Sequence, residues 1–108
     1  MFIVMNRFRV STAHKADFEA VWERRERNLE RFEGYVSFAL LRNWLADEAT
    51  TEYISHTVWR TREDFETWLA SDEFMRVHGR SSVAAILEGP PEAALYEAIL
   101  EEASSARA

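Results

Sequence analysis

Residues Phe65 to Gly79 read F-E-T-W-L-A-S-D-E-F-M-R-V-H-G, and this stretch supplies the second helix on which the predicted fold depends. Its apolar residues recur at helical spacing up to a break near Ser71–Asp72, where a new N-cap begins a shorter helix. His78 lies one turn after Phe74 on the apolar side, and Gly79 is the predicted stop. A histidine in that place has either a structural or a ligand-binding role, and the stretch alone leaves both open.

Strands are predicted on both sides of this helix. Residues Glu52–Trp59 are rich in β-branched and aromatic side chains, and they lead into a capping box at Thr61–Asp64. After the helix, Arg80–Pro91 is predicted to be a loop, because Pro90–Pro91 is incompatible with a regular helix or a central strand. Ala94–Leu100 is then the last strand.

The N-terminal half follows a similar order. Residues Phe2–Val10 alternate between two faces, as a half-buried strand does, with Asn6 as the polar member of the apolar row. The apolar residues from Ala13 to about Phe32 recur at helical spacing and predict the first helix. Gly34 ends this helix, and Tyr35–Arg42 is predicted to be a strand with apolar residues on both faces.

The order strand, helix, strand, strand, helix, strand predicts an α+β, ferredoxin-like βαββαβ fold. In this fold a four-stranded antiparallel sheet carries both helices on one face. Since the second strand is apolar on both faces, we expect the uncovered face to pack against a second copy of the chain, giving a homodimer. Residues 1–100 are predicted to form a single domain, and residues 101–108 a frayed C-terminal tail.

Composition narrows the classes of function. The chain has 108 residues, of which 47% are hydrophobic and 30% charged, and its net charge of -6 argues against nucleic acid as a partner. No apolar run approaches the roughly 18 residues of a membrane-spanning helix, and no signal peptide is recognised, so we expect no membrane association and a cytoplasmic location. The absence of cysteine excludes disulfides and thiolate metal sites.

Four residues that are unusual for an apolar face are predicted to meet between the sheet and the helices: Asn6, Arg25, Trp68 and His78. Each has an ordinary alternative. Asn6 could be satisfied by a local hydrogen bond, and Arg25 could extend to solvent or pair with a glutamate rather than bind an anion. Taken together, an imidazole, an amide, an aromatic wall and a guanidinium suit a large flat ligand with carboxylates and a metal, and haem fits that description.

The remaining polar and aromatic residues receive plainer interpretations. The Glu and Arg residues between Glu19 and Arg31 are predicted to form a solvated helix face. Trp44 and Trp59 are interpreted as packing residues.

Several motifs resemble one family. The chain is similar to the IsdG-type haem-degrading monooxygenases, of the antibiotic-biosynthesis-monooxygenase group of dimeric α+β barrels, and most similar to their proteobacterial branch. The resemblance extends to about Leu100. It is carried by N-R at Asn6–Arg7, F-E-G-Y at Phe32–Tyr35, H-T-V-W-R-T-R-E-D-F-E-T-W at His56–Trp68 and S-D-E-F-M-R-V-H at Ser71–His78.

The resemblance implies roles for five residues. In the family, the histidine matching His78 binds the haem iron, the asparagine matching Asn6 donates a hydrogen bond on the opposite side, and the tryptophan matching Trp68 distorts the macrocycle. Arg25 matches an arginine near the propionates, and Trp22 matches an aromatic residue that lines the pocket. The two sheets of the dimer would close into a β-barrel.

The resemblance also implies a reaction. Haem would be both substrate and cofactor, and O2 with electrons from a separate, unidentified reductase would open the porphyrin ring and release iron. No flavin or nicotinamide fingerprint is present in the sequence, so neither is expected as a bound cofactor. Two alternatives stay open. One is a cofactor-free monooxygenase acting on a quinol or an aromatic polyketide, and the other is a haem-binding carrier without turnover.

Overall fold

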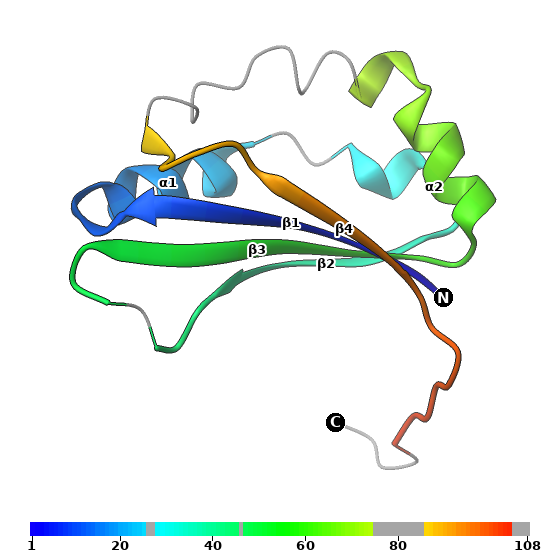
Figure 1. Cartoon of the computed structure of the whole chain (residues 1–108). Coiled ribbons are helices and arrows are strands. Elements are labelled where there is room, and N and C mark those ends of the chain that lie inside the picture. The colour runs from blue at the N-terminus through cyan, green and yellow to red at the C-terminus, as the bar shows by residue number, and fades with distance from the viewer. Residues whose placement is uncertain (26–27, 46, 75–85, 105–108) are drawn as a thin grey trace.

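The computed structural model describes residues 1–25, 28–45, 47–74 and 86–104. Within them, four strands form one antiparallel sheet in the order β2-β3-β1-β4, and α1 and α2 lie on the same face of it (Figure 1). The α+β, ferredoxin-like prediction is therefore confirmed. The elements are β1 (Phe2–Ser11), η1 (Thr12–His14), α1 (Lys15–Arg24), η2 (Leu29–Arg31), β2 (Tyr35–Arg42), β3 (Thr50–Trp59), α2 (Arg62–Leu69) and β4 (Glu92–Glu97).

The strand β1 occupies the interior of the sheet, between β3 and β4. Its side chains alternate as the sequence predicts. Phe2, Val4, Phe8 and Val10 are buried on the face that the helices cover, while Ile3, Met5, Arg7 and Arg9 lie on the opposite face. This alternation buries one row of apolar side chains and leaves Asn6 in the middle of that row.

The first helix is shorter than predicted. The periodicity indicates a helix to about Phe32, but α1 ends at Arg24, and Arg25 already has extended backbone angles (φ -67°, ψ 153°). A 3-10 turn, η2, follows at Leu29–Arg31. The reason is tertiary: Trp22 packs against one group of core residues and Leu29 against another, so the chain turns between them.

The second helix begins where the capping box predicts. The Thr61 hydroxyl accepts a hydrogen bond from the Asp64 backbone N–H at 3.1 Å, which satisfies one of the free amides of the first turn. Phe65 of α2 is buried against the sheet. A further helical turn begins at residues 72–74, and residues 75–85, which include His78, lie outside the described residues.

The last strand is displaced toward the N-terminus from its predicted range. Ala94–Leu100 is predicted, but β4 spans Glu92–Glu97. Glu97 pairs with Phe2, the first residue of β1, and the Ala98 N–H donates to the Met1 carbonyl. Because β1 offers no further partner, the strand ends there, and Ile99 is left 94% exposed.

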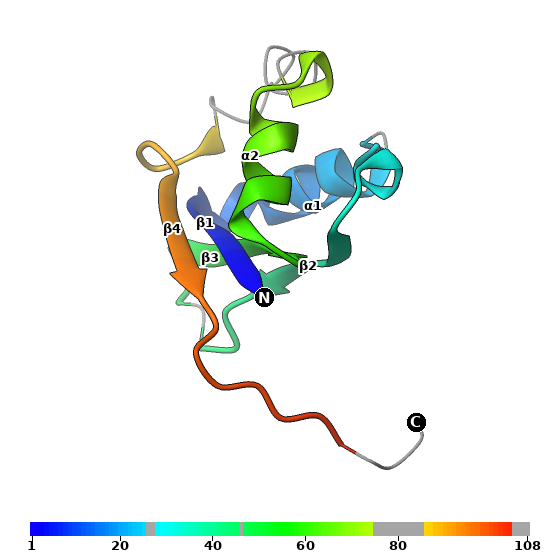
Figure 2. The same cartoon turned by 90° about the vertical axis from the view of Figure 1, so that its right-hand side faces the viewer.

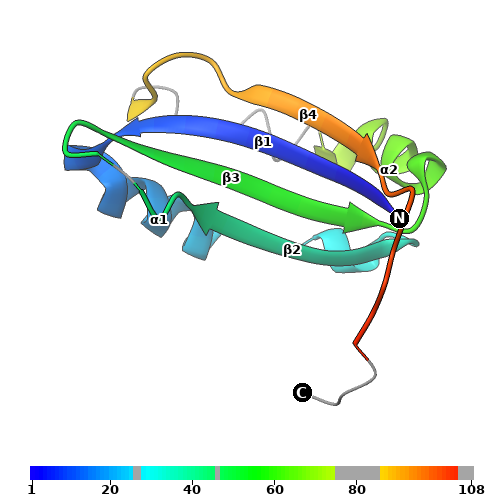
Figure 3. The ribbon, with the colours of Figure 1, turned by 60° about the horizontal axis from the view of Figure 1, so that its bottom comes forward.

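No helix of the described residues lies on the other face of the sheet, as Figure 3 shows from that side. The β2–β3 connection and the segment after β4 both extend beyond this face (Figures 1 and 2). Trp44 in that connection is 95% exposed, so its interpretation as a packing residue is wrong within the described part of the chain, whereas Trp59 is fully buried. No helix among the described residues is long and apolar enough to span a membrane.

Candidate functional site

A row of polar or small side chains crosses the middle of the helix-covered face of the sheet. Asn6 pairs with Ser55 on β3 and with Ala93 on β4, and Ser55 pairs in turn with Leu40 on β2. Ser55 is buried and Asn6 is half-buried. Because paired residues of neighbouring strands share a face, the amide of Asn6 and the hydroxyl of Ser55 lie side by side beneath the helices.

Two aromatic clusters flank this row. The α2 cluster consists of buried Phe2, Val4, Trp59 and Phe65, with Leu29, Phe32, Tyr35 and Trp68 packed against it. The α1 cluster consists of buried Phe8, Val10, Phe18 and Tyr53, with Trp22, Leu40, Ile86 and Leu87 packed against it. Val4 and Phe8, the neighbours of Asn6 in its row, belong to different clusters. Asn6 is thus the polar boundary between them.

Trp68, one of the predicted site residues, lies in the α2 cluster and is half-buried. Its ring centroid is 5.9 Å from that of Trp59 and 4.9 Å from that of Phe74, which meets it edge-on at 84°. These contacts hold the indole between the sheet and the turn that begins at residue 72. Trp59 beneath it is fully buried, and its indole N–H has no hydrogen-bond partner among the described residues.

Trp22 and Arg25 come together at a different place, beside β2. The Trp22 ring stacks on Phe38 at 5.6 Å and 17°, and the Arg25 guanidinium carbon lies 4.2 Å from the Phe38 ring centroid and 5.5 Å from that of Trp22. The cation is therefore held over aromatic faces rather than directed freely into solvent. This places Arg25 where it can meet an anion at the edge of the sheet.

These residues border an open hollow of about 980 Å³ between α1 and β2. It is large enough for a ligand of ordinary cofactor size. Its lining mixes aromatic side chains with both cations and carboxylates. Besides Trp22, Arg25 and Phe38, it is lined by residues such as Lys15, Glu30, Tyr35, Leu40, Tyr53 and Trp44.

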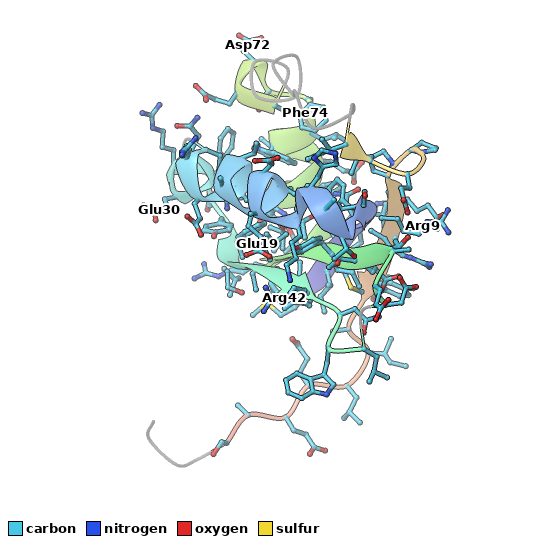
Figure 4. All side chains as sticks on the ribbon, turned by 90° about the vertical axis from the view of Figure 1, so that its left-hand side faces the viewer. Arg9, Glu19, Glu30, Arg42, Asp72 and Phe74 are labelled. Atoms are coloured by element: carbon cyan, nitrogen blue, oxygen red, sulfur yellow. The ribbon has the colours of Figure 1, made fainter. Side chains whose placement is uncertain are left out.

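The same hollow contains a hydrogen-bond network that no pattern in the sequence predicted. The Tyr53 hydroxyl donates to the Glu19 carboxylate at 2.5 Å, and Arg42 Nη1 donates to the same oxygen at 3.0 Å. Figure 4 views this side of the molecule, with Glu19 on α1 close to Arg42 on β2. Glu19 is therefore half-buried and paired, and its prediction as part of a solvated face is wrong.

The network shifts the pKa values of all three residues, and the hydrogen bond to Glu19 raises that of Arg42. The Tyr53 hydrogen bond, followed by the Arg42 contact, lowers the pKa of Glu19 despite its partial burial. Burial, followed by the Glu19 bond, raises the pKa of Tyr53 to about 12. At neutral pH the network accordingly holds an ionised carboxylate against a protonated phenol. The sequence does indicate that Tyr53 is buried, because it is an even number of residues from Trp59 and so lies on the same face of β3.

The five predicted site residues are thus brought together only in part. Trp22 and Arg25 are in mutual contact, Trp68 lies in the α2 cluster, and Asn6 lies between the two clusters. His78 lies outside the described residues. Among the described residues, no group of three or more histidine or acidic side chains could hold a metal ion, whereas a haem iron requires only one histidine from the protein.

Comparisons with known proteins extend over the whole fold. The family model for antibiotic biosynthesis monooxygenase matches residues 1–80. A search of curated proteins found no match. Among solved structures, the chain resembles a Bacillus cereus protein assigned to the antibiotic biosynthesis monooxygenases, with 19% identity, a TM-score of 0.78 and 98% of each chain covered.

Two further solved structures are of proteins with a stated activity. One is the haem degrader MhuD of Mycobacterium tuberculosis with two haems bound in its active site (20% identity, TM-score 0.75, 95% of this chain and 100% of that chain covered). The other is SnoaB, a cofactor-independent oxygenase of Streptomyces nogalater (27% identity, TM-score 0.69, 93% and 94% covered).

Proposed function

The chain belongs to the antibiotic biosynthesis monooxygenase family, and from this membership we propose that it is a haem-degrading monooxygenase. It binds haem as both substrate and cofactor, opens the porphyrin ring with O2 and electrons from a separate reductase, and releases iron. The observation that carries the proposal is the half-buried amide of Asn6 between two aromatic clusters, one of which contains Trp68.

The surroundings of Asn6 explain why an amide is tolerated in an apolar row. Among the described residues, the Asn6 side chain takes part in none of the hydrogen bonds found. A fully buried amide without a partner costs on the order of 1–3 kcal/mol, and half-buried Asn6 bears part of that cost. A ligand that accepts a hydrogen bond from the amide would offset this cost, which favours a functional role for Asn6.

The aromatic and basic residues suit a flat dianionic ligand. Trp68, backed by Trp59 and Phe74, offers one face against which a macrocycle can lie. Arg25 offers a guanidinium for carboxylate recognition at the edge of the sheet, supported by Trp22 and Phe38. These features support haem, whose apolar ring carries two propionates.

His78 is proposed as the iron ligand, on the basis of the family resemblance. The bound haem supplies oxygen activation and the ring carbon that is attacked. The chain itself would contribute an imidazole for the iron at His78, a hydrogen-bond donor at Asn6, an aromatic wall at Trp68 and a carboxylate contact at Arg25. We further propose that the functional unit is a homodimer joined through the uncovered face of the sheet.

A hemin titration tests this function. Wild type should give a shifted Soret band, and His78→Ala should lose it, while the surface control His14→Ala should bind normally. Asn6→Ala and Trp68→Ala should still bind hemin and show the shifted band, but after ascorbate is added in air the band should disappear more slowly than in wild type. For Asn6→Ala we expect the rate of disappearance to fall at least about tenfold, the factor that corresponds to about 1.4 kcal/mol. Released iron is measured with ferrozine.

Two results would contradict the proposal: a wild-type protein that gives no Soret shift, or a His78→Ala variant that keeps the shift unchanged. A haem spectrum that stays stable after ascorbate in air would instead indicate a carrier without turnover.

The likeness to SnoaB supports a second candidate function, a cofactor-free monooxygenase acting on a quinol or an aromatic polyketide. In that case the hollow beside Trp22 and Phe38 would receive an aromatic substrate by stacking, and His78 would not need to bind iron. Oxygen uptake by haem-free protein with a quinol distinguishes the two candidates, since haem degradation predicts none.

A further inference from the structure

Few contacts determine how α1 sits on the sheet. Phe18 is the one fully buried residue of the helix. Half-buried Trp22 adds ring contacts to Phe8 and Phe38. Apolar ring contacts allow a helix to rotate or slide more easily than hydrogen bonds do, because hydrogen bonds have a strict geometry. The strongest polar contact available is Glu19, next in sequence, which accepts hydrogen bonds from Tyr53 on β3 and Arg42 on β2.

Glu19 lies on the same face of α1 as Trp22, one of the residues proposed to bind the ligand. Glu19 and Trp22 are three residues apart on α1 and therefore face the same way. Their partners on β2, Arg42 and Phe38, are four residues apart and share one face of that strand. The helix is thus joined to β2 at two successive points, the carboxylate at one and the stacked rings at the other.

Arg25 depends on this alignment. It follows directly after α1, and its backbone N–H donates to the Trp22 carbonyl at 3.4 Å. Its guanidinium lies over Phe38. A rotation or shift of α1 would therefore move Trp22 and Arg25 together, away from Phe38 and from the hollow that they border.

Releasing Glu19 would also leave a buried donor without a partner. Tyr53 is 1% exposed, and Glu19 is the acceptor of its hydroxyl. An unsatisfied buried hydroxyl is costly, and hydrogen bonds to a charged carboxylate are stronger than neutral ones. The contact therefore opposes any movement of α1 that would break it.

We propose that Glu19, held by Tyr53 and Arg42, is a positioning residue that keeps Trp22 and Arg25 at the edge of the hollow and so gives the site its preference for ligands with carboxylates. The role of Glu19 in setting α1 depends on the structure alone. The identification of the carboxylates as haem propionates rests on the proposed function.

Glu19→Gln tests the proposal because positioning and simple electrostatics predict opposite changes in the affinity for hemin. Removing a negative charge near the hollow would strengthen the binding of an anion through Coulomb forces alone. The amide oxygen introduced by Glu19→Gln can still accept from Tyr53 and Arg42, but through weaker, neutral hydrogen bonds, so positioning predicts that this variant binds hemin more weakly, by up to about tenfold. Hemin dimethyl ester, which has no free carboxylates, can lose only the Trp22 ring contact, so its affinity should fall less than that of hemin in Glu19→Gln.

The matched control is Glu23→Gln, which removes the same charge from an exposed residue of the same helix that also borders the hollow but makes no hydrogen bond or ion pair with Tyr53 or Arg42 in the structure. It should bind hemin as tightly as wild type or more tightly. Tyr53→Phe should weaken hemin binding in the same direction as Glu19→Gln. If Glu19→Gln bound hemin as well as wild type, or weakened hemin and its ester equally, the positioning role would be refuted.

A ligand-free measurement separates this inference from the proposed function. The aromatic ring of Phe38 should shift the Arg25 Nε–Hε resonance upfield in an NMR spectrum of the wild type. In Glu19→Gln this shift should diminish, and in Glu23→Gln it should persist. An unchanged resonance in Glu19→Gln overturns the inference whether or not the protein binds haem, whereas a missing Soret shift in wild type overturns only the haem assignment.

Discussion

At the scale of single residues, Tyr53 makes the stability of the folded protein depend on pH. Its ring is buried in the α1 cluster and its hydroxyl donates to Glu19. Burial disfavours the charged phenolate and the neighbouring carboxylate repels it, so the pKa of Tyr53 rises to about 12 from the ordinary 10.0. Protonation of a single side chain thereby becomes part of what holds α1 to the sheet.

The sign of the pH dependence follows from this shift. The folded state binds the phenol proton more tightly than the unfolded state, so the stabilisation is complete below pH 10 and is lost as pH rises toward about 12. A shift of this size corresponds to on the order of 2–3 kcal/mol. Urea unfolding between pH 9 and pH 12 should show this decrease in wild type and a smaller one in Tyr53→Phe. Parallel curves for wild type and Tyr53→Phe would contradict the prediction.

At the scale of elements, Gly34 joins the start of β2 to the start of α2. Its φ of +84° lies in the left-handed region, and its carbonyl accepts a hydrogen bond from the Arg60 N–H at 2.7 Å. A Cβ at this position would overlap the Asp64 carboxylate in the first turn of α2. Glycine is therefore required here both by backbone conformation and by space.

Gly89 provides the comparison for a mutation at Gly34. Its φ is also positive, +119°, but a Cβ there would meet only the end of the Arg9 side chain, at 3.9 Å. Gly34→Ala should therefore destabilise the protein more than Gly89→Ala, by roughly 1–3 kcal/mol beyond the shared backbone cost. Urea unfolding measures both, and Gly34→Ala with Asp64→Ala should recover part of the difference. Equal losses for the two glycines would show that the overlap is relieved without cost.

At the scale of the whole molecule, the uncovered face of the sheet carries an apolar patch beside the ion pairs of Arg7 with Glu52 and Glu92. Alternate residues of the strands, opposite to those under the helices, include Ile3, Met5, Ile54 and Val58, with Leu41 and Tyr96 toward the edges. Trp44 and Ile99, almost fully exposed, lie in segments that extend beyond the same face (Figures 1 and 2). Exposed apolar surface of this kind is typical of an interface, which supports the proposed homodimer.

Light scattering tests the homodimer. At micromolar concentration the wild type should have the mass of two 12.6 kDa chains. Leu41→Glu places a charge on the uncovered face and should shift the protein toward a single chain, because a buried unpaired charge is costly. Val21→Glu, a similarly exposed apolar position on α1, should leave the mass unchanged. A wild-type mass of one chain would refute the dimer.

Most of the fold was predictable from the sequence because it depends on local periodicity. The alternation from Phe2 to Val10, the bounds of β2 and the N-cap at Thr61 are determined by residues that are near one another in the chain. The ends of α1 and β4 were not predicted correctly. Each depends on a distant partner: on the two clusters that divide Trp22 from Leu29, and on where β1 begins.

The candidate site divides in the same way. The sequence by itself determined that Asn6 falls in a buried row and that Trp68 falls on the inner face of a helix, because strand and helix periods follow from neighbouring residues. Only the tertiary structure decided that Glu19 meets Tyr53 and that Arg25 lies over Phe38. Those contacts depend on how strands distant in sequence are paired and on where a helix turns away, and no local pattern encodes either.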